Sequence, residues 1–293
     1  MMKVLFIINP KSGKGLIKNH LLEIVDIMVK AGMDITIYTT QAEADATRKV
    51  LESAADFDEI ICSGGDGTLD EVVAGLIQSG SDIPLGYIPA GSTNDFANSL
   101  KIPKGMVKAA HAAMHGREFP CDIGSFNGKT FVYVSAFGLF TAVSYQTSQQ
   151  LKNLFGHAAY ILEGAKHLWE IPSYALKVEY GEHEFEDEFI YGMVTNSVSV
   201  GGFKGMTGDD VRLDDGIFEA AFIKKPKNPF ELNEILRCLT NMIDDSDLIY
   251  SFKTDELHIT AKEEIAWTLD GEFGGKHTKV VIKNLTKRIR ILV

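Results

Sequence analysis

Short apolar runs that alternate with amphipathic stretches fill the first third of the chain, and this alternation constrains the fold most. The strand-like runs are residues 4–8, 33–38, 59–62 and 85–88. The stretches between them place apolar residues at helical spacing. Strands that alternate with helices form a parallel sheet with right-handed crossovers. Glycine-containing loops follow three of the runs, so we expect these loops at the carboxyl edge of the sheet, where open α/β sheets bind ligands.

The pattern changes at about residue 121, where short β-rich runs become dominant. These runs are residues 131–135, 175–180, 188–195, 217–223, 257–261, 265–269 and 279–282. Helical periodicity returns only at residues 154–168 and 229–244. We therefore predict two domains, an α/β domain of residues 1–123 and an antiparallel β-rich domain of residues 124–293. The last run, residues 289–293, is a strand that either domain could hold.

The charge balance disfavours nucleic acid as a partner. The chain has 29 Lys and Arg against 40 Asp and Glu, a formal charge of -11 over 293 residues, and it lacks the broad positive field that nucleic-acid binding requires. Two basic stretches still allow contact with anionic lipid, although a solvated strand face is the favoured interpretation of both. They are Lys224, Lys225 and Lys227, and Lys276, Lys279, Lys283, Lys287, Arg288 and Arg290.

The sequence also predicts where the protein works. Its three cysteines are far apart and lack the paired spacing of zinc or redox sites, which is typical of a reduced, cytoplasmic protein. The apolar run at the N-terminus is too short for a signal peptide, and polar residues interrupt the uncharged segment 130–151. We therefore expect no transmembrane helix.

The loop after the third strand-like run carries the clearest chemical signal. It reads Gly64-Gly65-Asp66-Gly67-Thr68 and leads from a buried strand into a helix. Backbone amides of such a loop can surround a phosphate at a helix N-terminus, although glycines alone fit a tight turn equally well. A carboxylate in a phosphate site requires an intervening cation, so Asp66 favours a nucleotide bound with Mg²⁺.

Other nucleotide signatures are absent. Gly13-Lys14 is followed by Gly15 and not by Ser or Thr, and Ile8 stands where a P-loop needs its first glycine. The same segment does not complete a dinucleotide-binding fingerprint. The loop after the fourth run, residues 89–96, adds hydroxyls, an amide and a second carboxylate at the same edge, and Thr93 or Asn94 could also cap the helix that follows.

Together, three segments resemble the loops of the diacylglycerol kinase catalytic-domain family, which includes bacterial soluble lipid kinases, sphingosine kinases and ceramide kinases. The segments are Asn9-Pro10-Lys11-Ser12-Gly13-Lys14, Gly64-Gly65-Asp66-Gly67-Thr68-Leu69-Asp70-Glu71 and Pro89-Ala90-Gly91-Ser92-Thr93-Asn94-Asp95-Phe96. The glycine-aspartate loop alone is shared with NAD kinases and is similar to a phosphofructokinase loop. The resemblance implies a phosphofructokinase-like, doubly wound α/β domain, then a β-sandwich-type domain that takes the lipid, with the active site in the cleft.

The resemblance also implies site residues. Asp66 and Asp95 would hold the catalytic Mg²⁺. Thr40 is assigned to the ATP site only by its distance along the sequence from Asp45. The residues expected around ATP are Asn9, Pro10, Lys11, Ser12, Gly13, Thr40, Gly65, Asp66, Gly67, Thr68, Leu69, Asp70, Glu71, Ser92 and Asn94.

Two motifs of the second domain extend the match. Asp270 and Glu272 flank a glycine and, by resemblance, one of them accepts the proton of the attacking hydroxyl, although an Asp-Gly hairpin turn is the simpler local interpretation. The segment 212–217 resembles a structural Mg²⁺ loop. There Asp215 and the backbone carbonyls of Arg212 and Ile217 would be ligands, and a plain turn is the alternative.

These features favour an ATP-dependent lipid kinase that phosphorylates a lipid hydroxyl, with diacylglycerol as acceptor and phosphatidic acid as product, at the inner face of a membrane. The alternatives are an NAD kinase and a nucleotide-sensing regulatory protein without turnover. The sequence also allows a homodimer. Several apolar residues could line a lipid cleft, although we expect most of them to pack in a core instead. They are Phe137, Leu139, Phe140, Leu154, Phe155, Tyr160, Ile161, Leu168 and Trp169.

Overall fold

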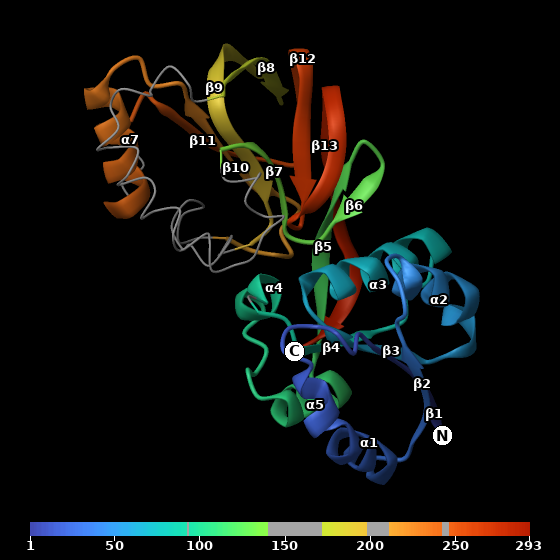
Figure 1. The fold of residues 1–293 in the computed structure, drawn as a ribbon. Coiled ribbons are helices and arrows are strands. Elements are labelled where there is room, and N and C mark those ends of the chain that lie inside the picture. The colour runs from blue at the N-terminus through green and yellow to red at the C-terminus, as the bar shows by residue number, and fades with distance from the viewer. Residues whose placement is uncertain (93, 140–171, 198–210, 242–245) are drawn as a thin grey trace. The chain divides into compact units, whose positions relative to one another are not determined.

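The protein divides into two compact units that share two long strands. The computed structural model describes residues 1–92, 94–139, 172–197, 211–241 and 246–293 (Figure 1). Met1–Ile123 with Thr286–Val293 form the first unit, and Gly124–Leu285 form the second. The chain passes between the units in β5 (Glu118–Phe126) and β13 (Glu272–Leu292). The final run of the sequence therefore lies in the first unit, as the end of β13.

The first unit contains the parallel sheet that the sequence predicts. Its strands follow the order β2-β1-β3-β4, and all neighbours are parallel. They are β1 (Met2–Ile8), β2 (Met33–Thr39), β3 (Glu59–Gly64) and β4 (Leu85–Pro89). β3 and β4 are buried along their whole length, which explains why they read as continuous apolar runs. The end of β13 adds a further parallel neighbour to β4, with Ile291 opposite Leu85.

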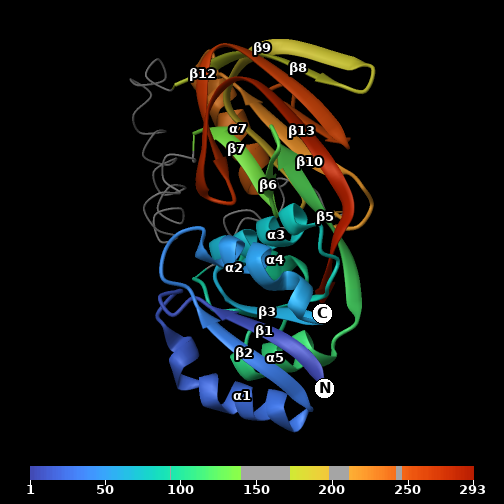
Figure 2. The same ribbon diagram turned by 90° about the vertical axis from the view of Figure 1, so that its right-hand side faces the viewer.

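Helices cover both faces of this sheet. Figures 1 and 2 show α1 and α5 on one face and α2 and α3 on the other. The helices are α1 (Leu21–Lys30), α2 (Asp45–Ser53), α3 (Asp66–Ser79), α4 (Asp95–Ser99) and α5 (Met106–His115), with short 3-10 turns η1 (Leu16–Asn19) and η2 (Ala54–Asp56). α3 begins at Asp66, immediately after β3, so the predicted order of strand, glycine loop and helix is confirmed.

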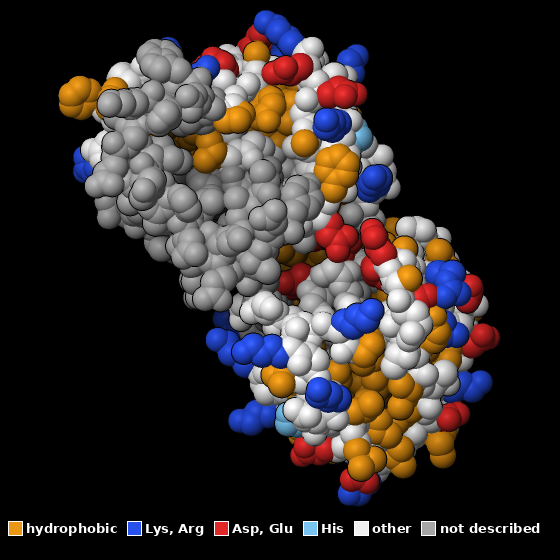
Figure 3. Space-filling model, viewed as in Figure 1, with side chains coloured by type: hydrophobic (Ala, Val, Ile, Leu, Met, Phe, Trp, Pro, Cys, Tyr) orange, Lys and Arg blue, Asp and Glu red, His pale blue; other side chains and the backbone are white. Residues whose placement is uncertain are grey.

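β2 is the outer strand of this sheet, and apolar side chains gather beside it. Figure 3 shows this apolar surface over α1 and β2. Leu22 and Val29 of α1 and Ile37 of β2 are exposed apolar side chains of these two elements. Only Met33 of β2 is buried, unlike the fully buried strands β3 and β4, because β2 lies at the edge of the sheet in the described part of the chain.

The second unit is built from antiparallel strands, with one described helix, α7 (Pro229–Asn241). Its strands, besides β5 and β13, are β6 (Lys129–Phe131), β7 (Val134–Gly138), β8 (Tyr174–Tyr180), β9 (His183–Thr195), β10 (Phe218–Lys224), β11 (Ile249–Thr254) and β12 (Glu256–Leu269). β7 and β8 each pair with both β9 and β12. The predicted helix at 154–168 lies outside the described residues.

An aromatic core holds the second unit together. The ring of Trp267 packs 5.0 Å from that of Phe126 and 4.8 Å from that of Phe137, measured between centroids. Phe137, a candidate for a lipid cleft, is fully buried in this core. Leu139 is half-buried, and the other candidate lipid-lining residues lie outside the described part. Within the described ranges, no helix combines the length and the apolar character needed to cross a membrane.

Candidate functional site

Asn9 joins two of the glycine-containing loops. It follows β1, and its backbone N–H donates to the carbonyl of Ser63 at 2.9 Å. Its side-chain amide donates to the hydroxyl of Thr68 in α3 at 3.0 Å, and its side-chain oxygen accepts the N–H of Lys11 at 3.0 Å. One side chain therefore sets both the course of its own loop and its distance from the start of α3.

Glycines allow the three loops to meet at backbone distance. The hydroxyl of Ser12 accepts the N–H of Gly65 at 2.6 Å. A β-carbon on Gly91 would lie 2.7 Å from the Cα of Gly65, and one on Gly13 would lie 2.4 Å from the carbonyl oxygen of Ala90. Gly13 also has a positive φ of 55°. Larger residues cannot occupy these positions unless the backbone moves, so the sequence motif is a packing requirement.

The sequence predicts that these loops bind ATP. Replacing Gly13 with alanine is then expected to lower ATP affinity by about tenfold, because the loop must move away from Ala90. Gly32→Ala is the matched control, since Gly32 also has a positive φ, of 81°, but has nothing within 4 Å of the added carbon. Titration of ATP into each variant measures the difference. Equal ATP affinity of the two folded variants would contradict this role of Gly13.

The loop after β4 is closed by an asparagine. Asn94 lies in the left-handed region, with φ of 52°, and is the N-cap residue of α4. Its side chain makes no capping bond, and instead accepts the N–H of Gly91 at 2.9 Å and donates to the carbonyl of Gly91 at 3.0 Å. Ser92 is exposed between them, and residue 93 lies outside the described residues.

Two aspartates meet at the starts of two helices. Asp66 opens α3, and its carboxylate accepts the backbone N–H of Asp95, the first residue of α4, at 3.3 Å. Asp95 is buried and Asp66 is half-buried. Burial and then the charge of Asp66 raise the pKa of Tyr87, whose hydroxyl donates to the carbonyl of Gly64. Asp66 thus places negative charge at the carboxyl edge of the sheet, where the sequence predicts it.

This donor set fits Mg²⁺. The described residues contain no group of three or more His, Cys, Asp or Glu arranged to hold a metal ion alone. Mg²⁺ usually takes only one or two protein carboxylates and completes its shell with phosphate oxygens and water. A pair of aspartates beside the glycine loop is therefore suited to Mg²⁺ that arrives with a nucleotide.

Some expected ATP residues have structural partners of their own. Glu71 of α3 accepts the backbone N–H groups of Ala44 and Ala46 at 2.9 and 3.0 Å. The side chain of Leu69 is fully buried in the core. Thr40 is half-buried, and its N–H donates to the carbonyl of Ile8 at 2.9 Å, directly before the Asn9 loop. Thr40 therefore lies at the same sheet edge as the three loops.

In the second unit, the Asp-Gly hairpin turn that the sequence predicts locally joins β12 to β13. Leu269 pairs with Glu272, and Asp270 and Gly271 between them have positive φ values of 51° and 87°, as a two-residue type I′ turn requires. Asp270 is buried, and its carboxylate accepts the N–H groups of three consecutive residues, Val132, Tyr133 and Val134. Glu272 is exposed on the same hairpin. The two acidic residues thus have different surroundings.

The segment 212–217 forms a turn. The carboxylate of Asp215 accepts the N–H of Ile217 at 3.1 Å, and Arg212 pairs with Asp214 at 3.4 Å. These contacts account for the turn without an ion, and the metal role of Asp215 stays a prediction.

Asp122 and Asp45 are among the buried acidic residues of the first unit that sequence reasoning missed. Asp122 of β5 is fully buried and accepts the N–H of Lys287 of β13 at 2.7 Å, where Lys287 has a positive φ of 50°. Asp45, used only to place Thr40, is buried at the start of α2. Asp122 could have been found from the sequence, because it is a single acidic residue inside an apolar stretch.

Comparison with known proteins agrees with this arrangement. Residues 3–126 match the model of the diacylglycerol kinase catalytic domain. A diacylglycerol kinase of Bacillus subtilis is 36% identical over 94% of this chain and 91% of its own length, and one of Staphylococcus carnosus is 34% identical over 92% and 88%. The crystal structure of a diacylglycerol kinase from Bacillus anthracis superposes with a TM-score of 0.77, at 26% identity, over 99% of this chain and 96% of that one. The chain belongs to the diacylglycerol kinase catalytic-domain family.

Proposed function

We propose that the protein is an ATP-dependent lipid kinase that transfers the γ-phosphoryl group to the hydroxyl of diacylglycerol and forms phosphatidic acid. The observation that carries this proposal is the contact between the Asp66 carboxylate and the start of α4, beside glycine loops packed at backbone distance. Relatives called diacylglycerol kinases that match nearly the whole chain support the acceptor class and favour it over NAD.

In this proposal, the first unit binds ATP. The loops that follow β1, β3 and β4 hold the phosphates through backbone amides, and Ser12 and Asn9 keep these loops in register. Asp66 and Asp95 hold Mg²⁺, which when bound neutralises charge on the transferred phosphoryl group. Phosphoryl transfer depends mainly on such positioning and charge neutralisation, and little covalent chemistry is required of the protein.

In this proposal, the second unit binds the acceptor lipid and contributes the carboxylate that accepts its proton. Of the two candidate carboxylates we propose Glu272 for this role, because Asp270 already accepts three backbone N–H groups in a buried position. Asp270 then acts by holding the hairpin that carries Glu272. A structural Mg²⁺ at Asp215 is part of the proposal, since carboxylate and carbonyl oxygens suit that ion.

We also propose that the enzyme meets its lipid by peripheral contact with the inner face of a membrane. The basic run in β13 supports this contact only in part. Arg290 pairs with Asp82 and Glu118, and Lys283 pairs with Glu256. Ion pairs of this kind reduce the positive charge that a surface offers to anionic lipid.

The test is a phosphoryl-transfer assay with labelled ATP, Mg²⁺ and separate acceptors: vesicles with diacylglycerol, vesicles with phosphatidylglycerol, and NAD. Label in phosphatidic acid is the expected result, and label in NAD alone would reject the lipid kinase. Asp66→Asn is expected to lower turnover by at least about 100-fold, because the site loses a charge that faces Mg²⁺. Asp26→Asn, an exposed residue of α1 paired with Lys30, is the control and should retain full turnover.

A further inference from the structure

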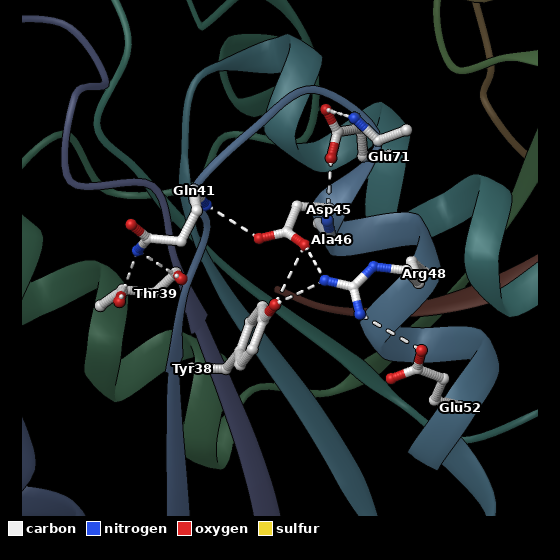
Figure 4. A network of polar contacts seen from close by, with 9 residues as sticks. Tyr38, Thr39, Gln41, Asp45, Ala46, Arg48, Glu52 and Glu71 are labelled. Carbon is white, nitrogen blue, oxygen red and sulfur yellow. Dashed lines mark hydrogen bonds and ion pairs between the residues drawn. The ribbon is translucent and has the colours of Figure 1, made fainter.

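A cluster of polar side chains holds the segment that joins β2 to α2. Asp45, at the first position of α2, is buried although it is ionisable. Its carboxylate accepts the backbone N–H of Gln41 at 2.8 Å and the hydroxyl of Tyr38 at 3.0 Å, and it pairs with the guanidinium of Arg48 (Figure 4). A buried carboxylate with three donors is a strong local constraint, since hydrogen bonds to charged groups are about twice as strong as neutral ones.

The partners of Asp45 are themselves connected. Arg48 also donates to the hydroxyl of Tyr38 at 3.1 Å and to Glu52 at 3.2 Å. The N–H of Gln41, followed by Arg48 and Tyr38, lowers the pKa of Asp45 against the opposing effect of burial. Asp45 therefore stays ionised at neutral pH.

A second carboxylate holds the other end of the same segment. Glu71 of α3 receives the N–H groups of Ala44 and Ala46, and its carbonyl accepts the hydroxyl of Thr47 at 2.8 Å. Ala44 has a positive φ of 60°, an unfavourable conformation for a residue with a side chain, and it is the N-cap of α2 without a capping side chain of its own. Glu71 supplies the cap that Ala44 lacks.

Thr40 lies between Tyr38 and Gln41, the two residues of this segment that donate hydrogen bonds to Asp45. Its N–H reaches the carbonyl of Ile8, at the point where the Asn9 loop begins. The side chain of Gln41 donates back to the carbonyl and hydroxyl of Thr39 at 3.0 and 3.2 Å. The segment 39–44 is thus fixed against the sheet edge where the ATP loops lie.

We propose that Asp45, with Tyr38 and Arg48, positions the segment 39–44 to form one wall of the nucleotide site. Asp45 is a positioning residue that acts through Thr40 on ATP binding, not on transfer. This inference rests on the proposed function for its ligand, and its residues belong to the first unit alone. It predicts an effect on ATP affinity that is separate from the rate of turnover and from lipid affinity.

The test compares Asp45→Ala, Asp45→Asn and Tyr38→Phe with the control Asp26→Asn, which removes the charge of a helical ion pair in the same unit. Asp45→Ala is expected to raise the ATP Kd and the KM for ATP by about tenfold, with kcat and the lipid KM within about twofold of the wild type. Asp45→Asn and Tyr38→Phe should have smaller effects in the same direction, because each retains part of the network.

Urea unfolding first establishes that each variant is folded under the assay conditions. Unchanged ATP affinity in folded Asp45→Ala, or a loss confined to kcat or to the lipid KM, would overturn the positioning role. The ATP Kd is measured without lipid, so the role of Asp45 and the lipid kinase activity can fail separately. A wild type that binds ATP but phosphorylates no lipid rejects the proposed function, while the ratio of Kd values still decides the role of Asp45.

Discussion

Replacing Glu272 with glutamine is expected to lower kcat by about 10²- to 10⁴-fold, the usual contribution of a general base. Glutamine keeps the length and shape of the side chain but cannot accept the proton of the attacking hydroxyl. Glu272 is exposed and opens β13 opposite Leu269, so the variant is expected to remain folded. ATP affinity should stay unchanged, because Glu272 is proposed to act on the lipid hydroxyl and not on the nucleotide.

The measurement is a steady-state assay with diacylglycerol vesicles, combined with ATP titration and urea unfolding of the same samples. Glu263→Gln, an exposed glutamate of β12, is the matched control and should keep the full kcat. If Glu272→Gln retains more than about a tenth of the wild-type kcat, the proton acceptor is another group. In that case the proposed roles of Asp270 and Glu272 are wrong, although the proposal for the ATP site of the first unit is unaffected.

The arrangement of the first unit could be predicted from the sequence because its signals are local. Each buried strand is a continuous apolar run, and each glycine loop follows a strand directly. The carboxyl ends of parallel strands share one edge, so loops such as those of Gly13, Gly65 and Gly91 had to be neighbours. The backbone distances between these loops confirm the prediction.

Contacts between distant residues limited the prediction for the second unit. The apolar run 131–135 is predicted as one strand. In the structure, β6 ends at Phe131 and β7 begins at Val134, so Val132 and Tyr133 belong to neither strand. The backbone N–H groups there bond to Asp270, 138 and 137 positions further along the chain. Periodicity carries no information about such a partner, because it describes only neighbours within one element.

Two further differences have similar causes. The runs 257–261 and 265–269 form one strand, β12, since the irregular pairing with β13 between Thr260 and Ile265 interrupts the apolar pattern but not the strand. β5 was not predicted because it contains Pro120 and Gly124, residues that usually weaken a strand assignment. In the first unit, Glu71 caps α2, although the whole of β3 separates the two in the sequence. The resemblance alone could not identify Glu71 as a cap.

Replacing Asp270 with glycine is expected to destabilise the second unit by about 3 kcal/mol or more, because buried N–H groups lose their acceptor at about 1–3 kcal/mol each. Glycine tolerates the positive φ of this position, so the loss would report on the hydrogen bonds and not on backbone strain. Asp270→Asn retains one acceptor oxygen and the same backbone preference, and it should cost less. Asp255→Asn is the control, since Asp255 is an exposed aspartate of the same unit.

The loss of stability is measured by urea unfolding, with the fluorescence of Trp267 as the signal. Trp267 is buried in the second unit, three positions before Asp270. An unfolding midpoint of Asp270→Gly equal to that of Asp255→Asn would show that the three hydrogen bonds contribute nothing to stability. Loss of the Asp270 carboxylate should also lower kcat, because the hairpin that carries Glu272 is no longer held. Asp270→Gly is thus expected to lose stability and activity together, whereas Glu272→Gln loses activity alone. This contrast separates the residue that positions the hairpin from the residue that accepts the proton.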